Sequence, residues 1–139
     1  MQQADDYIKE VEALADLLSG QPDDVFELKT LFKSWTVNDV IGHLHMFDLA
    51  ALAALEGDAA FDAFFAPIQA NLSQGLTLLQ CQYPFLGALS GIELFQKWHA
   101  TAQVVSVAYS SADPKQRVKW AGPEMSTLSC ITARQMATW

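Results

Sequence analysis

Apolar residues recur at three- and four-residue steps along several stretches of this chain, which is typical of helices that bury one face. The pattern predicts four long helices over residues 3–19, 36–56, 67–82 and 90–110, a shorter helical piece over 58–66, and a last helix that begins after Ser126. No stretch shows convincing strand character. The pattern therefore predicts an all-α bundle, with connections longer than those of a plain up-down arrangement.

Polar residues mark where two of these helices begin. Thr36 followed by Asp39 reads as a capping box at the start of the 36–56 helix, and Ser90 followed by Glu93 reads as another. Ser126 is the expected N-cap of the last helix.

Two prolines and an apolar connector complete the predicted boundaries. Pro67 is expected to begin a helix, because proline is tolerated in a first turn, and Pro84 is expected to end one. The 23–34 connector carries Leu31 and Phe32 among its apolar residues, so we expect it to lie against the bundle.

The 36–56 helix carries the unusual chemistry of the chain. Asp48 falls near the middle of its apolar face, while His43 and His45 fall on the two flanks. An unpaired buried carboxylate is costly, so Asp48 needs a partner, and we expect Arg134 on the last helix to supply it. Periodicity does not choose between the two histidines. Trp35, just before the helix, is expected to be a core anchor.

Composition limits the possible functions. A chain of 139 residues, half of them hydrophobic, fits a single domain over 1–139. No apolar run is long enough to cross a membrane, and the first residues lack a signal-peptide pattern, so we expect a cytoplasmic protein. A net charge of −8 disfavours nucleic-acid binding. Cys81 and Cys130 are expected to be free thiols in the core.

The motif over residues 35–44 resembles a known signature. It matches the pattern W-(T/S)-x-x-(D/H)-V-(L/I)-x-H-L of the DinB-like superfamily, and it is closest to the N-terminal domain of mycothiol-dependent maleylpyruvate isomerases. The stretches 117–123, 125–126 and 132–139 resemble a metal-binding branch of the same group.

The resemblance implies a DinB-like four-helix bundle that holds a divalent metal, zinc or nickel. The family ligand on the second helix lies eight residues after the tryptophan, which is His43 here. The last helix would carry glutamate at the position of Ala137 and histidine four residues later. This chain departs from that pattern, because residue 137 is alanine and the chain stops at Trp139 inside a helical pattern. We therefore expect the last helix to be cut short.

Two functions follow from the resemblance. The first is a metal- and thiol-dependent isomerase or transferase, in which His43 binds the metal, a low-molecular-weight thiol binds to that metal, and Asp48 orients a ligand or replaces one. The alternative is a non-catalytic binding or interaction module with a degenerate metal site, which Ala137 favours. A third possibility is that a longer protein supplies the missing ligand beyond Trp139. Helical bundles of this kind also suit a homodimer.

Overall fold

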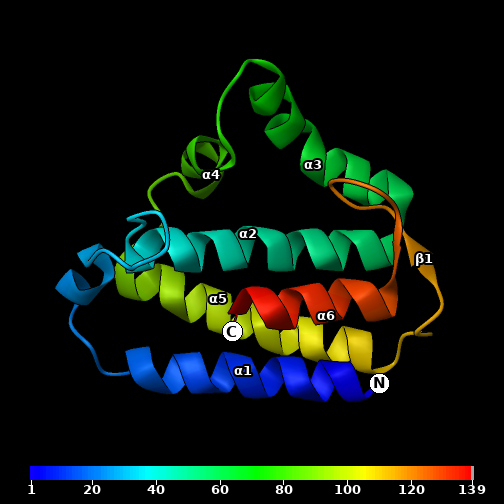
Figure 1. Cartoon of the computed structure of the whole chain (residues 1–139), viewed down its shortest axis with the longest axis horizontal. Coiled ribbons are helices and arrows are strands. Elements are labelled where there is room, and N and C mark those ends of the chain that lie inside the picture. The colour runs from blue at the N-terminus through cyan, green and yellow to red at the C-terminus, as the bar shows by residue number, and fades with distance from the viewer. Residues whose placement is uncertain (139) are drawn as a thin grey trace.

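The computed structural model describes residues 1–138, and helices make up most of this part of the chain (Figure 1). The helices are α1 (Gln2–Leu18), the 3-10 helix η1 (Asp23–Glu27), α2 (Val37–Glu56), α3 (Asp58–Ser73), α4 (Leu78–Leu86), α5 (Gly91–Ser110) and α6 (Thr127–Thr138). One short antiparallel pair, β1 (Arg117–Val118) with β2 (Met125–Ser126), precedes α6. The all-α prediction is confirmed.

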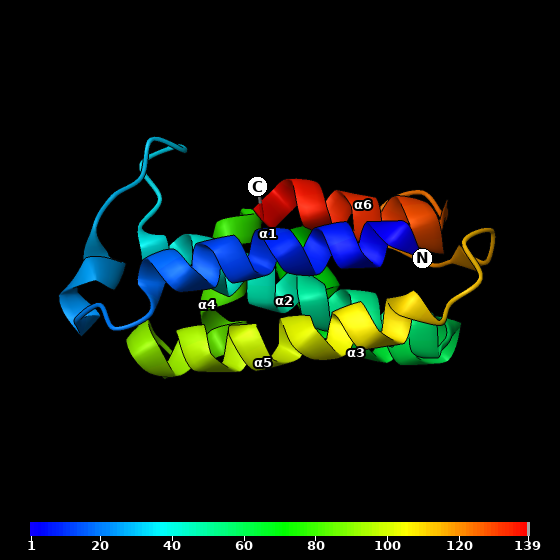
Figure 2. The same cartoon turned by 90° about the horizontal axis from the view of Figure 1, so that it is seen from below.

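Four helices form the bundle: α1, α2, α5 and α6 run side by side (Figures 1 and 2). The third predicted stretch is not one of them. Residues 67–82 are divided between the end of α3, which begins at Asp58, and the start of α4, and both helices pack against α2 outside the four-helix layer. Of residues 1–138, no helix is both long and apolar enough to cross a membrane.

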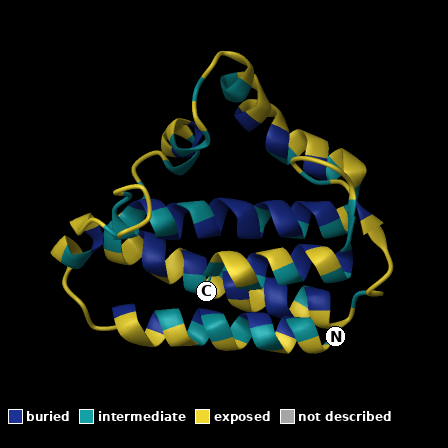
Figure 3. Ribbon diagram, in the orientation of Figure 1, coloured by how far each residue is buried: buried dark blue, intermediate teal, exposed yellow. Residues whose placement is uncertain are grey.

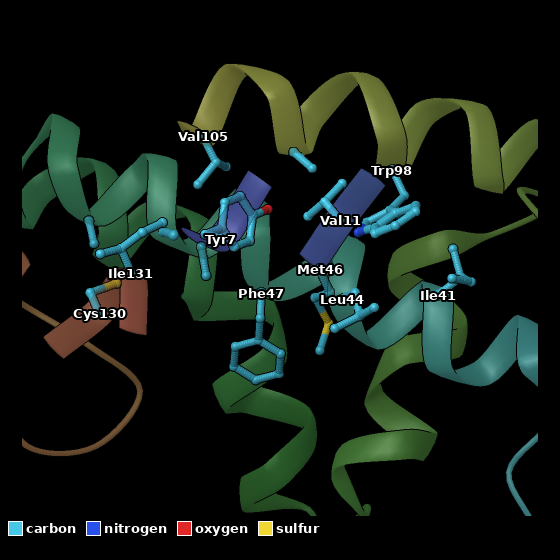
Figure 4. Packing of buried hydrophobic residues seen from close by; sticks show 14 of the residues in the cluster. Tyr7, Val11, Ile41, Leu44, Met46, Phe47, Trp98, Val105, Cys130 and Ile131 are labelled. Atoms are coloured by element: carbon cyan, nitrogen blue, oxygen red, sulfur yellow. The ribbon is translucent and has the colours of Figure 1, made fainter. Parts of the chain in front are cut away.

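The core runs along α2, which is buried over most of its length (Figure 3). Helix α2 has neighbours on several sides, so residues on more than one of its faces are buried. Leu44 and Phe47 of α2 meet Tyr7 of α1, Trp98 of α5 and Ile131 of α6 in this core (Figure 4). Cys81 and Cys130 are buried free thiols, as predicted.

Two of the three predicted helix caps are present, and one is absent. Asp39 N donates to Thr36 Oγ1 at 3.0 Å and Thr36 N donates to Asp39 Oδ2 at 3.0 Å, which confirms the capping box of α2. Ser129 N donates to Ser126 Oγ at 3.1 Å, which confirms the start of α6. The capping box at Ser90 is wrong, because the Ser90 side chain makes no capping hydrogen bond.

The first N–H groups of α5 are instead bound by side chains from earlier segments. Gly91 N donates to Asn38 Oδ1 at 2.7 Å, and Ile92 N donates to Asp23 Oδ1 at 2.9 Å. Both acceptors are more than fifty residues away in sequence. A local motif such as Ser-x-x-Glu cannot reveal this arrangement, because the partners are brought in by the fold.

Both proline predictions are wrong. Pro67 lies inside α3, which continues without a break to Ser73, and Pro84 lies inside α4. The break falls at residues 74–77 instead, where Gly75 has a positive φ of 90° and Thr77 forms a capping box with Gln80. Helix α3 tolerates its proline because residues on both sides of it, among them Phe65 and Ile68, are buried in the core.

The 23–34 connector lies only partly against the bundle. Phe26 is buried, but Leu31 and Phe32 are exposed, which corrects the expectation for the second half. Residues 28–37 form a hairpin that stands out from the helices (Figure 2). Thr30 N donates to Trp35 O at 2.7 Å, and Val37 N donates to Leu28 O at 2.9 Å. We call this segment the 28–37 hairpin.

Candidate binding pocket around His43

A large cavity lies where the 28–37 hairpin, α2, α4 and α6 converge. Its volume is about 970 Å³, which is within the range of small-molecule sites. Most of its lining is apolar, contributed by Phe32, Trp35, Val40, Leu44, Leu78, Leu79, Met136 and Ala137. The polar lining comes from His43, Lys33 and three threonines, Thr30, Thr77 and Thr138.

His43 lies on α2 and joins a row of aromatic rings at this pocket. Its ring centroid is 5.7 Å from that of Trp35 and 4.8 Å from that of Phe47. Its Nδ1 atom is buried and has no hydrogen-bond partner among residues 1–138. Burial, and secondarily the charge of Arg134, lowers the pKa of His43 to about 4. His43 is therefore neutral at pH 7.

Trp35 forms part of the pocket wall, which corrects its expected role as a core anchor. It is partly exposed and stands outside the buried cluster. Its ring meets that of Phe32 edge-on, with a centroid distance of 5.1 Å and an interplanar angle of 84°. Both residues belong to the 28–37 hairpin, so this hairpin supplies an aromatic side of the pocket.

The two histidines of α2, which periodicity could not distinguish, have different environments in the structure. His43 lines the pocket, whereas His45 is absent from its lining and is buried, not on the surface as its flank position indicated. Burial, and secondarily Lys97, lowers the pKa of His45. His99 lies outside the pocket lining, with its Nε2 2.9 Å from Glu12 Oε1.

Asp48 forms the ion pair predicted with Arg134. Arg134 Nε donates to Asp48 Oδ1 at 2.9 Å, and Tyr7 OH donates to Asp48 Oδ2 at 2.8 Å. Arg134 also donates from Nη2 to Leu44 O at 3.2 Å. Burial raises the pKa of the Asp48 carboxyl, although Arg134 and Tyr7 oppose that shift. Both carboxylate oxygens are thus engaged inside the core, and Asp48 is not part of the pocket lining.

The donor set of the pocket does not fit a divalent metal. Over the described part of the chain, His43 is the only histidine, cysteine or acidic residue in the lining, and Ala137, which lines the same pocket, has no side-chain donor. Within residues 1–138, no group of three or more such side chains is placed to hold a metal ion. Zinc takes at least three protein ligands at a catalytic site, so one imidazole is insufficient.

Sequence reasoning found His43 but missed most of the pocket. Lys33 and Phe32 come from the 28–37 hairpin, Leu78 and Leu79 from α4, and Met136 from α6. These segments are far apart in sequence, and each residue follows the ordinary pattern of its own element. No local signal identified them, and the apolar pattern of the connector predicted that Phe32 would pack against the bundle, whereas it is exposed.

Comparison with known proteins gives one family. Residues 8–139 match the sequence profile described as the mycothiol maleylpyruvate isomerase N-terminal domain. An uncharacterised protein from each of two Mycobacterium tuberculosis strains is 30% identical over 134 residues, which is 96% of this chain and 51% of the relative. The chain thus spans about half the length of these curated relatives. No solved structure gives a significant match.

Proposed function

The chain belongs to the mycothiol maleylpyruvate isomerase N-terminal domain family, and from that premise we propose that it binds a small organic molecule in the pocket beside His43. One observation carries the proposal: the pocket is mostly apolar and has one neutral hydrogen-bonding imidazole, without the set of donors that a metal needs. Such a lining, with few polar groups, is typical of small-molecule sites.

His43 would orient the ligand by a single hydrogen bond. Its neutral imidazole can accept a hydrogen bond from a hydroxyl or thiol group or donate one to an acceptor. A histidine whose pKa is about 4 is a weak base, so it would not ionise a thiol whose pKa is about 8.5. The residues present therefore support binding of a hydroxyl or thiol compound better than they support generation of a thiolate.

A metal- and thiol-dependent isomerase or transferase is the second candidate. The observation that favours it is that His43 and Ala137, two of the three positions that the resemblance assigns to metal ligands, line the same pocket. With alanine at 137, this function would require further ligands from outside residues 1–138. The family name associates the domain with mycothiol, a thiol, which suits either candidate.

The test compares two neutral probes by calorimetric titration. 2-Naphthol carries a hydroxyl donor, and 2-methoxynaphthalene has the same rings without the donor. We expect 2-naphthol to bind about two- to tenfold more tightly to the native protein, because a neutral hydrogen bond contributes about 0.5–1.5 kcal/mol. In His43→Phe the preference should disappear while both probes still bind. His99→Gln, remote from the pocket, is the control and should keep the preference.

Metal content decides between the two candidates. After incubation with zinc or nickel and removal of the free ion, elemental analysis should find no stoichiometric metal in the native protein. About one metal ion per chain, lost in His43→Ala, would instead establish the second candidate. If neither 2-naphthol nor 2-methoxynaphthalene binds, the proposed pocket function is contradicted.

A further inference from the structure

The charge of the pocket differs in sign from the charge of the chain. The chain carries 16 acidic and 8 basic residues, yet the pocket lining contains no aspartate or glutamate. Among residues 1–138, Lys33 is the only charged side chain in the lining. A pocket that presents one cation and, within residues 1–138, no carboxylate side chain is suited to an anionic ligand, which the acidic remainder of the protein would otherwise repel.

Lys33 is held at the pocket by a tight turn with an unusual backbone. Lys33 and Ser34 have φ values of 50° and 60°, in the left-handed region that non-glycine residues seldom adopt. Trp35 N donates to Phe32 O at 2.9 Å across this turn. Positive φ at both central residues is the mark of a type I′ hairpin turn, for which Asn-Gly would be the favoured sequence. Lys-Ser in this position therefore costs stability, and such costs concentrate where ligands are bound.

The ammonium group of Lys33 is available to a ligand. Its Nζ lies 5.4 Å from the centre of the Phe32 ring, and it makes no ion pair with any residue in the part of the chain that the structure describes. Phe32 also lines the pocket, so the cation is placed beside the apolar wall. Thr77 adds a second polar group. Its Oγ1 accepts from Gln80 N at 3.1 Å, which leaves its hydroxyl hydrogen to donate to a ligand.

We propose that the ligand is an amphiphilic carboxylate, with an aromatic or branched apolar body and one carboxylate that pairs with Lys33. The body would lie between the Phe32–Trp35 wall of the 28–37 hairpin and the Leu78–Leu79 wall of α4. This inference rests on the proposed binding function and adds the ligand class to it.

The experiment compares 2-naphthoate with 2-naphthamide by calorimetric titration at low ionic strength. The two probes have the same rings and nearly the same shape, and they differ in charge. We expect the carboxylate to bind roughly two- to fivefold more tightly to the native protein, which is the range for a partly exposed ion pair. The preference should shrink as salt is added, because exposed charges are screened.

Two variants distinguish a direct contact of the carboxylate with Lys33 from the effect of the overall charge of the protein. Lys33→Gln should bring the two probes to equal affinity. Lys29→Gln removes the same charge from the same hairpin at a position outside the pocket lining, and it should keep the preference. Equal binding of both probes to the native protein would overturn the carboxylate inference and leave the proposed function intact. Failure of both to bind would overturn both proposals. Loss of the preference in both variants alike would also overturn the specific role of Lys33.

Discussion

His43 combines a buried ring nitrogen without a partner and a position on the wall of an apolar pocket. The Nδ1 atom has almost no accessible surface, so a ligand in the pocket would meet the other ring nitrogen of His43. Because the ring is largely buried, a hydrogen bond to that nitrogen would be stronger than one to an exposed histidine.

The protonation of His43 gives a prediction about pH. Its pKa is about 4 in the folded protein, against about 6.5 for an unperturbed histidine, so the folded state binds this proton less readily than the unfolded state. Its contribution to stability is fully present above about pH 6.5 and is lost as the pH falls toward 4. Between pH 7 and pH 4, the free energy of unfolding of the native protein should fall by roughly 2–3 kcal/mol more than that of His43→Gln.

Nuclear magnetic resonance checks this prediction directly. The imidazole signal of His43, identified by its loss in His43→Gln, should remain that of the neutral ring at pH 5. Half-protonation near pH 6.5 would contradict the burial argument and would weaken the case for a neutral hydrogen-bonding group in the pocket.

For single residues of α2, the sequence predicted the partner of Asp48 but not the burial of His45. An acid in the middle of an apolar face has a cost that only a counter-charge can offset, and few arginines were available, so Arg134 could be chosen. The flank position of His45 carried no such constraint. It is buried because α2 is covered on more than one face, and the periodicity of one helix does not report how many neighbours it has.

Among the elements, α4 depends on a glycine of α2. A Cβ atom at Gly42 would lie 2.6 Å from Leu86 Cδ1 and 2.7 Å from Gln82 Nε2. Gln82 cannot move away freely, because it is fully buried and its Nε2 donates to Asp39 O at 2.8 Å. The close approach of the two helices at Gly42 therefore fixes the α4 wall of the pocket.

Gly42→Ala should move α4 and weaken the pocket. Alanine favours a helix by about 1 kcal/mol, but overpacking of a buried contact costs about 1–3 kcal/mol, so we expect a net loss of up to about 2 kcal/mol. Binding of 2-naphthol should weaken as well, because Leu78 and Leu79 would shift. Gly122→Ala is the control, since its Cβ would meet no atom within 4 Å. Urea unfolding and calorimetry measure both effects, and a stabilised Gly42→Ala with unchanged binding would contradict this role.

The sequence was least informative about the elements around the pocket. Pro67 and Pro84 are strong local signals for helix boundaries, yet both lie within helices. The signal that matters was weaker: Gly75 followed by a Thr77-x-x-Gln80 capping box. Tertiary burial around α3 offsets the local cost of a proline, and burial was not available from local sequence.

Across the whole molecule, one buried network joins three bundle helices. Asp48 of α2 is bound to Tyr7 of α1 and to Arg134 of α6. The guanidinium of Arg134 also lies 5.8 Å from the centre of the Phe47 ring. Removal of one partner would leave the other charge buried without compensation, which is the costly case for a buried pair.

Arg134→Met should therefore lower the free energy of unfolding by about 3–5 kcal/mol, as measured by urea titration. The double variant Asp48→Leu, Arg134→Met should recover a large part of that loss, because it removes both charges. Arg117→Met, which breaks an exposed pair with Glu124, is the matched control and should cost less than about 1 kcal/mol. A loss in Arg134→Met as small as that of Arg117→Met would show that the network contributes little.

The first turn of α5 has a consequence for the order of folding. Its N–H groups are bound by Asn38 and Asp23, so this turn lacks a local means of nucleation. It can be completed only after η1 and the start of α2 have reached their places, because the acceptors come from those segments. We therefore expect the N-terminal end of α5 to form late in assembly, whereas α2, which carries its own capping box, can begin on its own.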